Sequence, residues 1–109
     1  MVEAPYEPFR IEVEEAGGAR RVVLRGEFDL AAADEAGDVL GAACAAGGRV
    51  EVDLDKVSFM DSSGLRTLVT ARRMAERDGC DVVVTAMSEE VRQLLVLTGT
   101  LDWLSGAGA

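Results

Sequence analysis

Two adjacent serines, Ser62 and Ser63, follow Asp61 in the stretch FMDSSGL, which spans residues 59–65. Residues before this stretch alternate in hydropathy and residues after it have helical spacing, so we expect the pair at the start of a helix. A serine there can cap the helix, because its hydroxyl accepts a hydrogen bond from an unpaired backbone N–H group. Alternatively, an exposed hydroxyl can accept a phosphoryl group, since a helix N-terminus favours anions. Composition alone favours the cap.

Catalysis by either serine would need a general base, and the chain of 109 residues contains no histidine. The sequence also lacks the G-x-S-x-G motif of a nucleophile elbow and the glycine-rich motifs that bind nucleotide phosphates. Carboxylate pairs such as Asp53 and Asp55 lack the spacing of a calcium-binding loop. We therefore expect a protein that is not an enzyme and has no metal site and no cofactor.

Asp61 could itself accept a phosphoryl group, as in a receiver domain, because it follows a predicted strand. Receiver chemistry needs an acidic pair after the first strand and a lysine after a late strand. The only lysine, Lys56, precedes Asp61, and the first strand ends in a predicted hairpin. The receiver hypothesis is therefore disfavoured.

The composition limits location and partners. The formal net charge is −9, which disfavours direct binding of nucleic acid. No run approaches the ~18 consecutive apolar residues of a membrane span, and the acidic start MVEAPYEPFR resembles neither a signal peptide nor an anchor. We expect a cytoplasmic protein in which Cys44 and Cys80, in separate predicted elements, are small buried thiols rather than a disulfide.

The elements that must position the serines alternate along the chain. Strands are predicted over residues 9–15, 20–26, 49–54 and 80–86; helices over 30–48, 63–78 and 88–98; and a short final element over 100–104. Strands separated by helices require crossovers, so we predict one small α/β domain. Its sheet should be mixed but mostly parallel, with helices packed against it.

Single residues predict where several helices begin and end. Asp29 and Ser88 are expected N-caps, and Gly79 is expected to stop the helix that follows the serines. Gly37 and Gly41 each cost a helix roughly 1 kcal/mol relative to alanine. We therefore expect close packing against the sheet to hold the helix that contains them.

Three stretches carry a resemblance to a known family. They are LRGEFDLAAADE, VDLDKVSFMDSSGLRTLV and VVVTAMSEEVRQLLVLTGTLDWL, and together they resemble the anti-sigma factor antagonist family of the STAS domain. The resemblance covers residues 9–104, with a flexible lead over 1–8 and a disordered tail over 105–109. Two departures are Phe28, where the family more often has leucine, and the proline-bearing lead.

The resemblance implies a partner switch. Such proteins bind an anti-sigma factor that is also a serine kinase and thereby free the sigma factor; the kinase phosphorylates the serine after the aspartate, and a separate serine phosphatase reverses this. Carried over by position, Ser62 is the phosphorylation site and Ser63 becomes the expected helix cap. The expected partner-binding residues are Asp61, Ser62, Ser63, Gly64, Arg66, Glu27 and Asp29.

Two alternatives stay open. The stripe formed by Arg66, Thr70, Arg73 and Arg77 could meet an acidic groove on the kinase, or it could be an ordinary solvated helix face. The whole chain could also be a STAS scaffold subunit that is never phosphorylated, within a larger stress-signalling or lipid-transport assembly.

Overall fold

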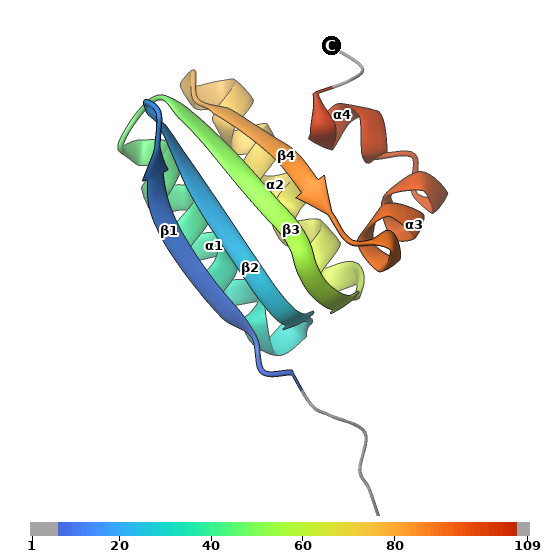
Figure 1. Ribbon diagram of the computed structural model, residues 1–109. Coiled ribbons are helices and arrows are strands. Elements are labelled where there is room, and N and C mark those ends of the chain that lie inside the picture. The colour runs from blue at the N-terminus through green and yellow to red at the C-terminus, as the bar shows by residue number, and fades with distance from the viewer. Residues whose placement is uncertain (1–6, 107–109) are drawn as a thin grey trace, which may run out of the picture.

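A four-stranded sheet with the order β1-β2-β3-β4 organises the computed structural model, which describes residues 7–106 (Figure 1). The strands are β1 (Arg10–Ala16), β2 (Ala19–Phe28), β3 (Arg49–Met60) and β4 (Asp81–Met87). β1 and β2 form an antiparallel hairpin, whereas β2 pairs with β3, and β3 with β4, in parallel. The predicted mixed, mostly parallel sheet is confirmed.

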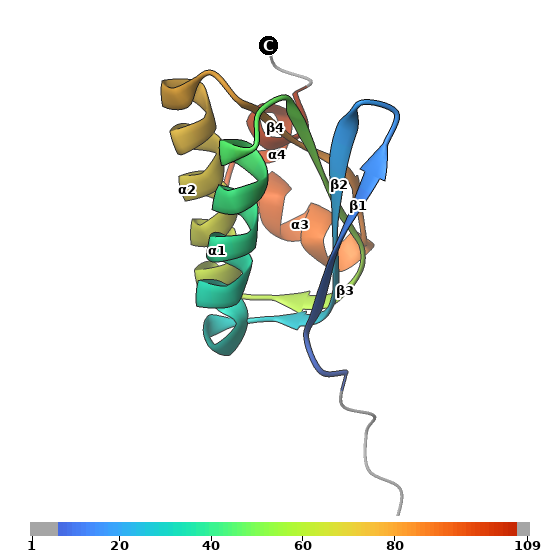
Figure 2. The same ribbon diagram turned by 90° about the vertical axis from the view of Figure 1, so that its left-hand side faces the viewer.

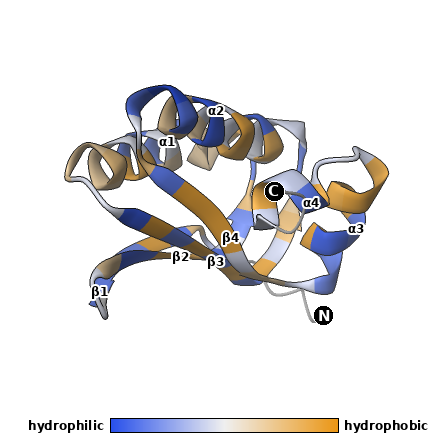
Figure 3. Cartoon of the chain, turned by 90° about the horizontal axis from the view of Figure 1, so that it is seen from above, coloured by the Kyte–Doolittle hydropathy of each residue, from blue (hydrophilic) through white to orange (hydrophobic). Residues whose placement is uncertain are grey.

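Four helices complete the domain: α1 (Leu30–Ala45), α2 (Ser62–Asp78), α3 (Glu89–Leu97) and α4 (Leu101–Ser105). α1 and α2 lie side by side over one face of the sheet (Figures 2 and 3), α4 packs against β4 at the edge of the sheet, and α3 packs against β3. None of the helices within residues 7–106 combines the length and the apolar composition that a membrane crossing requires.

The main core lies between the sheet and the α1/α2 layer. Its fully buried side chains include Phe28 on β2, Leu54 on β3 and Leu68 on α2. The opposite face of the sheet carries charged residues, among them the ion pairs Arg21–Glu51 and Arg49–Asp81. At the β1 edge the exposed residues include Glu12, Glu14 and Glu15.

β3 is longer than predicted. Residues 55–61 were expected to connect a strand to a helix, but the strand continues to Met60. The register with β2 shifts between the pairs Val23–Asp53 and Arg25–Lys56, so β3 carries an extra residue there and its simple alternation breaks after Leu54. Beyond it, Val57 and Met60 are 1% and 8% exposed and return the strand to the core.

α1 packs against the sheet, as expected, but its two glycines take no part in that contact. A Cβ atom added at Gly37 would meet only the Thr67 methyl group of α2, at 3.9 Å, and one at Gly41 would meet nothing within 4 Å. The sheet contact of α1 comes instead from buried alanines and Leu40. The glycines therefore line the space between α1 and α2, and Leu30, the first residue of α1, is 74% exposed.

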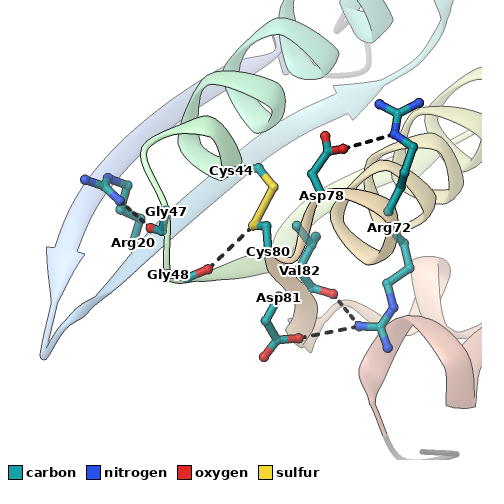
Figure 4. The surroundings of a disulfide bond; sticks show 10 residues. Arg20, Cys44, Gly47, Gly48, Arg72, Asp78, Cys80, Asp81 and Val82 are labelled. Atoms are coloured by element: carbon teal, nitrogen blue, oxygen red, sulfur yellow. Dashed lines mark hydrogen bonds and ion pairs between the residues drawn. A yellow bond between two sulfur atoms is a disulfide. The ribbon is translucent and has the colours of Figure 1, made fainter.

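The expectation of two separate thiols is also wrong. Cys44, in the last turn of α1, and Cys80, directly before β4, form a disulfide with their Cα atoms 5.7 Å apart (Figure 4). The two residues are 36 positions apart, and only the packing of α1 beside the end of α2 brings them together.

The structure describes the last two residues of the expected lead, Glu7 and Pro8, and the first two of the expected tail, Ser105 and Gly106. The carbonyl oxygen of Glu7 accepts a hydrogen bond from Glu27 at 3.3 Å, and the carbonyls of Glu7 and Pro8 lie so close to Gly26 that no Cβ atom would fit there. Ser105 is the last residue of α4. Residues 1–6 and 107–109 lie outside the described residues.

Candidate functional site

The serine pair lies at the carboxyl ends of β2 and β3. These strands are parallel neighbours, with Phe28 paired to Met60, and the backbone N–H of Asp61 donates to the carbonyl of Phe28 at 3.4 Å. Because both strands run into helices at this edge, the fold brings residues 27–29 next to residues 61–64. Residues 61–64, which are the N-cap and the first residues of α2 and which we call the switch loop, therefore adjoin residues 27–29.

Asp61, and not a serine, caps α2. One of its carboxylate oxygens accepts hydrogen bonds from the backbone N–H groups of Ser63, at 2.9 Å, and Gly64, at 3.1 Å. The expected cap at Ser63 is wrong, because β3 continues to Met60 and places Asp61 one position before the first helical residue. Asp29 and Ser88 cap α1 and α3 as predicted.

Because Asp61 caps α2, the hydroxyl of Ser62 is not needed to cap the helix. Ser62 is the first residue of α2, it is exposed, and within residues 7–106 its hydroxyl forms no hydrogen bond. Ser63 is half-buried and lines the groove between α1 and α2, while its carbonyl accepts a hydrogen bond from the Thr67 hydroxyl. The two serines therefore face different surroundings, and Ser62 is the accessible one.

Gly64 lets the start of α2 approach the ends of β2 and β3. It is buried, and an added Cβ atom would lie 2.6 Å from the carbonyl oxygen of Phe28 and 2.7 Å from Cγ of Met60. Both distances are shorter than real Cβ atoms tolerate. The glycine thus fixes how closely the switch loop sits on the sheet.

The electrostatics of the switch loop combine carboxylates with two helix N-termini. Glu27, Asp29 and Asp61 are half-buried at this edge, and α1 and α2 both begin here with their positive dipole ends. Arg66 is exposed one turn into α2 and forms no ion pair with another described residue. An added anion at Ser62 would therefore lie near the positive end of the α2 dipole and one guanidinium, as well as neighbouring carboxylates.

Two apolar side chains at this edge, Phe59 and Leu30, are exposed, and the sequence predicted a surface role for neither. Phe59 is 48% exposed and pairs in register with Glu27, and Leu30 is the first residue of α1. Strand alternation counted from the buried Val57 would place Phe59 in the core, but the register with β2 skips Ser58, so Met60 is buried instead and the sequence pattern alone does not identify Phe59 as exposed. Both side chains are therefore accessible for apolar contact with another molecule.

A groove of about 690 Å³ runs between α1 and α2 from the switch loop to the opposite end of the helices. Ser63 and Arg66 line it near the switch loop, and Cys44 and Cys80 line its far end. In the part of the chain that the structure describes, no three histidine, cysteine or acidic side chains gather in a way that could hold a metal ion.

Comparison with protein families decides the classification. The sequence-family model of the STAS domain matches residues 10–106, nearly the whole chain. The chain belongs to the STAS domain family. The resemblance inferred from the sequence is confirmed. The small α/β domain with its mixed four-stranded sheet is a STAS fold.

Solved structures agree with this assignment. An anti-sigma factor antagonist from Mycobacterium paratuberculosis is 29% identical, with a TM-score of 0.76 over 95% of this chain and 87% of that one. The anti-sigma factor antagonist SpoIIAA in its unphosphorylated form shares the fold at 23% identity, with a TM-score of 0.74 over 86% of this chain and 84% of that one. The Bacillus cell fate determinant SpoIIAA in its phosphorylated form gives 21% identity and a TM-score of 0.67, over 86% and 87% of the two chains.

Proposed function

We propose that this STAS domain is an anti-sigma factor antagonist whose binding is switched by phosphorylation of Ser62. In its unphosphorylated form it binds an anti-sigma factor that is also a serine kinase, and the sigma factor is released. The kinase transfers the γ-phosphoryl group of ATP to the Ser62 oxygen, which gives ADP and a proton, and the complex dissociates. A serine phosphatase restores the binding form, and all of these partners meet the protein in the cytoplasm.

The observation that carries this proposal is that Asp61, and not Ser62, caps α2. Asp61 caps α2, so the hydroxyl of Ser62 is exposed at the helix start without a hydrogen bond to any described residue. A kinase can therefore reach Ser62 without unfolding the helix. The likeness to anti-sigma factor antagonists, one of them determined in both unphosphorylated and phosphorylated forms, supports the same function.

The surroundings of Ser62 supply a binding surface for the kinase. Polar contacts would come from Glu27, Asp29, Asp61 and Arg66, and apolar contacts from the exposed Phe59. Phosphorylation adds about −1.5 to −2 charges in the centre of this surface. The anion is tolerated by the start of α2, so its effect falls on the partner rather than on the fold.

Phosphate incorporation tests the proposal directly. Each candidate anti-sigma factor kinase is incubated with the protein and ATP, and the intact mass is measured, followed by peptide mapping. We expect one added phosphate at Ser62, its loss in Ser62→Ala, and its retention in the matched variant Ser63→Ala. A chain that binds such kinases but never gains phosphate would overturn the switch and favour the scaffold role.

A further inference from the structure

Cys44 and Cys80 connect two parts of the domain that are far apart in sequence. Cys44 lies in the last turn of α1, and Cys80 lies between Gly79, the left-handed cap of α2, and the start of β4 (Figure 4). Their Cα separation of 5.7 Å lies within the range that a disulfide spans. The bond therefore ties the end of α1 to the junction between α2 and β4.

Small molecules can reach this disulfide. Both cysteines are partly exposed and line the far end of the α1/α2 groove. Glycines flank them: Gly47 follows the end of α1 and Gly79 precedes Cys80, and a Cβ atom added at either glycine would meet no atom within 4 Å. Both glycines line the same groove as the two cysteines, so the groove is open beside the disulfide.

The same site also suits the reduced form. The sulfur of Cys80 lies 3.5 Å from the carbonyl oxygen of Gly48, which would accept a hydrogen bond from the Cys80 thiol once the disulfide is broken. Disulfides in cytosolic proteins are usually transient and redox-sensing rather than permanent. A pair that is accessible when oxidised and has a hydrogen-bond acceptor when reduced matches that behaviour.

We propose that Cys44 and Cys80 form a reversible redox-modification site whose reaction partners are low-molecular-weight thiols and disulfides of the glutathione class. In reduction, a small thiolate attacks one cysteine sulfur, which breaks the S–S bond, forms a mixed disulfide and releases the other cysteine as a thiolate. A second small thiolate attacks the sulfur of the small molecule in the mixed disulfide. This releases the second cysteine, so the protein gains two electrons and two protons while two small thiols become one small disulfide.

Oxidation should stiffen the half of the domain that carries the switch loop. The bond closes a segment that contains the whole of β3 and α2, including Ser62. Closing such a loop restricts the unfolded chain and raises stability. It also fixes α1 to the α2–β4 junction at the end of the groove opposite Ser63. The inference does not depend on whether Ser62 is phosphorylated.

Equilibration of the full chain in redox buffers tests this site. The protein is held at defined ratios of reduced to oxidised glutathione, quenched by alkylation and analysed by intact mass, and its melting temperature is measured at each ratio. We expect a folded protein that interconverts between a dithiol and a form about 2 Da lighter, with the oxidised form melting at least about 5 °C higher.

Cysteine variants provide the controls. The double variant Cys44→Ser/Cys80→Ser should melt close to the reduced wild-type protein and should not respond to the buffer. If this variant fails to fold, reduced wild type still supplies the comparison. The proposal is overturned if both thiols stay alkylatable at every glutathione ratio, if reduction occurs only after unfolding, or if the two forms melt at the same temperature.

Discussion

One carboxylate oxygen of Asp61 lies 2.9 Å from the backbone nitrogen of Ser63, so the helix cap precedes the serine pair instead of being part of it. Because the same oxygen also accepts from Gly64, the carboxylate satisfies two of the N–H groups that α2 leaves unpaired at its start. The hydroxyl groups of Ser62 and Ser63 can consequently be changed without removing the cap. This separation allows the fold and the switch to be tested independently.

The first prediction concerns the cap. Asp61→Ala should lower the free energy of unfolding by about 1 kcal/mol, since it removes a helix N-cap. Asp61→Asn should keep most of the stability, because the amide oxygen can accept the same bonds. Urea denaturation measures both, and Asp38→Ala, at an exposed position within α1, is the control expected to change little. Equal stability of Asp61→Ala and wild type would contradict the assigned cap.

The second prediction concerns charge at Ser62. A carboxylate on the kinase about 5 Å from an added negative charge would cost about 3 kcal/mol at an effective dielectric of 20. Ser62→Asp should therefore weaken binding to the kinase roughly 100-fold by calorimetry. Ser62→Asn, which has a similar shape and no charge, should bind within a few-fold of wild type. If both variants bind equally well, charge is not the switch.

The third prediction compares two glycines. Gly64→Ala should destabilise the protein by about 1–3 kcal/mol, because its Cβ atom would overlap the Phe28 carbonyl and the Met60 side chain. Gly41→Ala adds a methyl group in open space within α1 and should stabilise it by about 0.5–1 kcal/mol. Thermal unfolding distinguishes the opposite signs. A neutral Gly64→Ala would mean that α2 can shift away from the sheet.

The fourth prediction concerns Arg72, whose guanidinium joins three elements. It donates to the carbonyl of Val82 on β4, pairs with Glu76 on α2 and lies over the ring of Trp103 on α4, 5.9 Å from the centroid (Figure 4 shows the β4 contact). Its side chain is 13% exposed. Arg72→Ala should cost about 2–3 kcal/mol, since a buried carbonyl loses a charged donor and an aromatic ring loses its cation.

The exposed neighbour of Arg72 supplies the control. Arg73→Ala removes a guanidinium from the same helix at an exposed position, and its stability should stay within about 0.5 kcal/mol of wild type. Denaturant unfolding of both variants gives the comparison. Similar losses at the two positions would show that the contacts with β4 and α4 contribute little.

The fifth prediction decides between the two interpretations of the arginine stripe on α2. If the stripe guides an acidic kinase surface, Arg66→Glu should slow association roughly tenfold at low salt, and the difference should shrink as salt screens the charges. Arg92→Glu, a matched reversal at an exposed position of α3, should leave the association rate nearly unchanged. Stopped-flow measurements at several salt concentrations test this. Equal rates for the two variants would identify an ordinary solvated face.

Much of the fold could be predicted because it depends on local chemistry. The order of elements follows from hydropathy periods, and the caps at Asp29 and Ser88 and the stop at Gly79 each depend on a few neighbouring residues. The cap of α2 was harder, because Asp61, Ser62 and Ser63 all favour the capping position. The residue at which β3 ends decides which of the three is the N-cap. An irregularity in β3 makes that end difficult to predict from the sequence.

The remaining features depend on distances between elements. Cys44 and Cys80 gave no sequence signal of pairing, because only the packing of α1 beside α2 brings their Cα atoms together. The weak helix propensity of Gly37 and Gly41 predicted that packing against the sheet holds α1, which is confirmed, but the direction the two glycines face depends on the rotation of α1 above the sheet. The candidate role of Ser62 came from the family resemblance, and the free hydroxyl that supports it came from the structure.

The two edges of the sheet differ in a way that bears on self-association. α4 packs against β4 (Figure 1), whereas β1 presents exposed Glu12, Glu14 and Glu15 along its strand. A second copy adding its own β1 here would bring like charges into register, and such an edge resists the strand-by-strand growth that leads to amyloid. The three glutamates of β1 therefore disfavour the addition of a second β1 strand and help to keep copies of the chain apart.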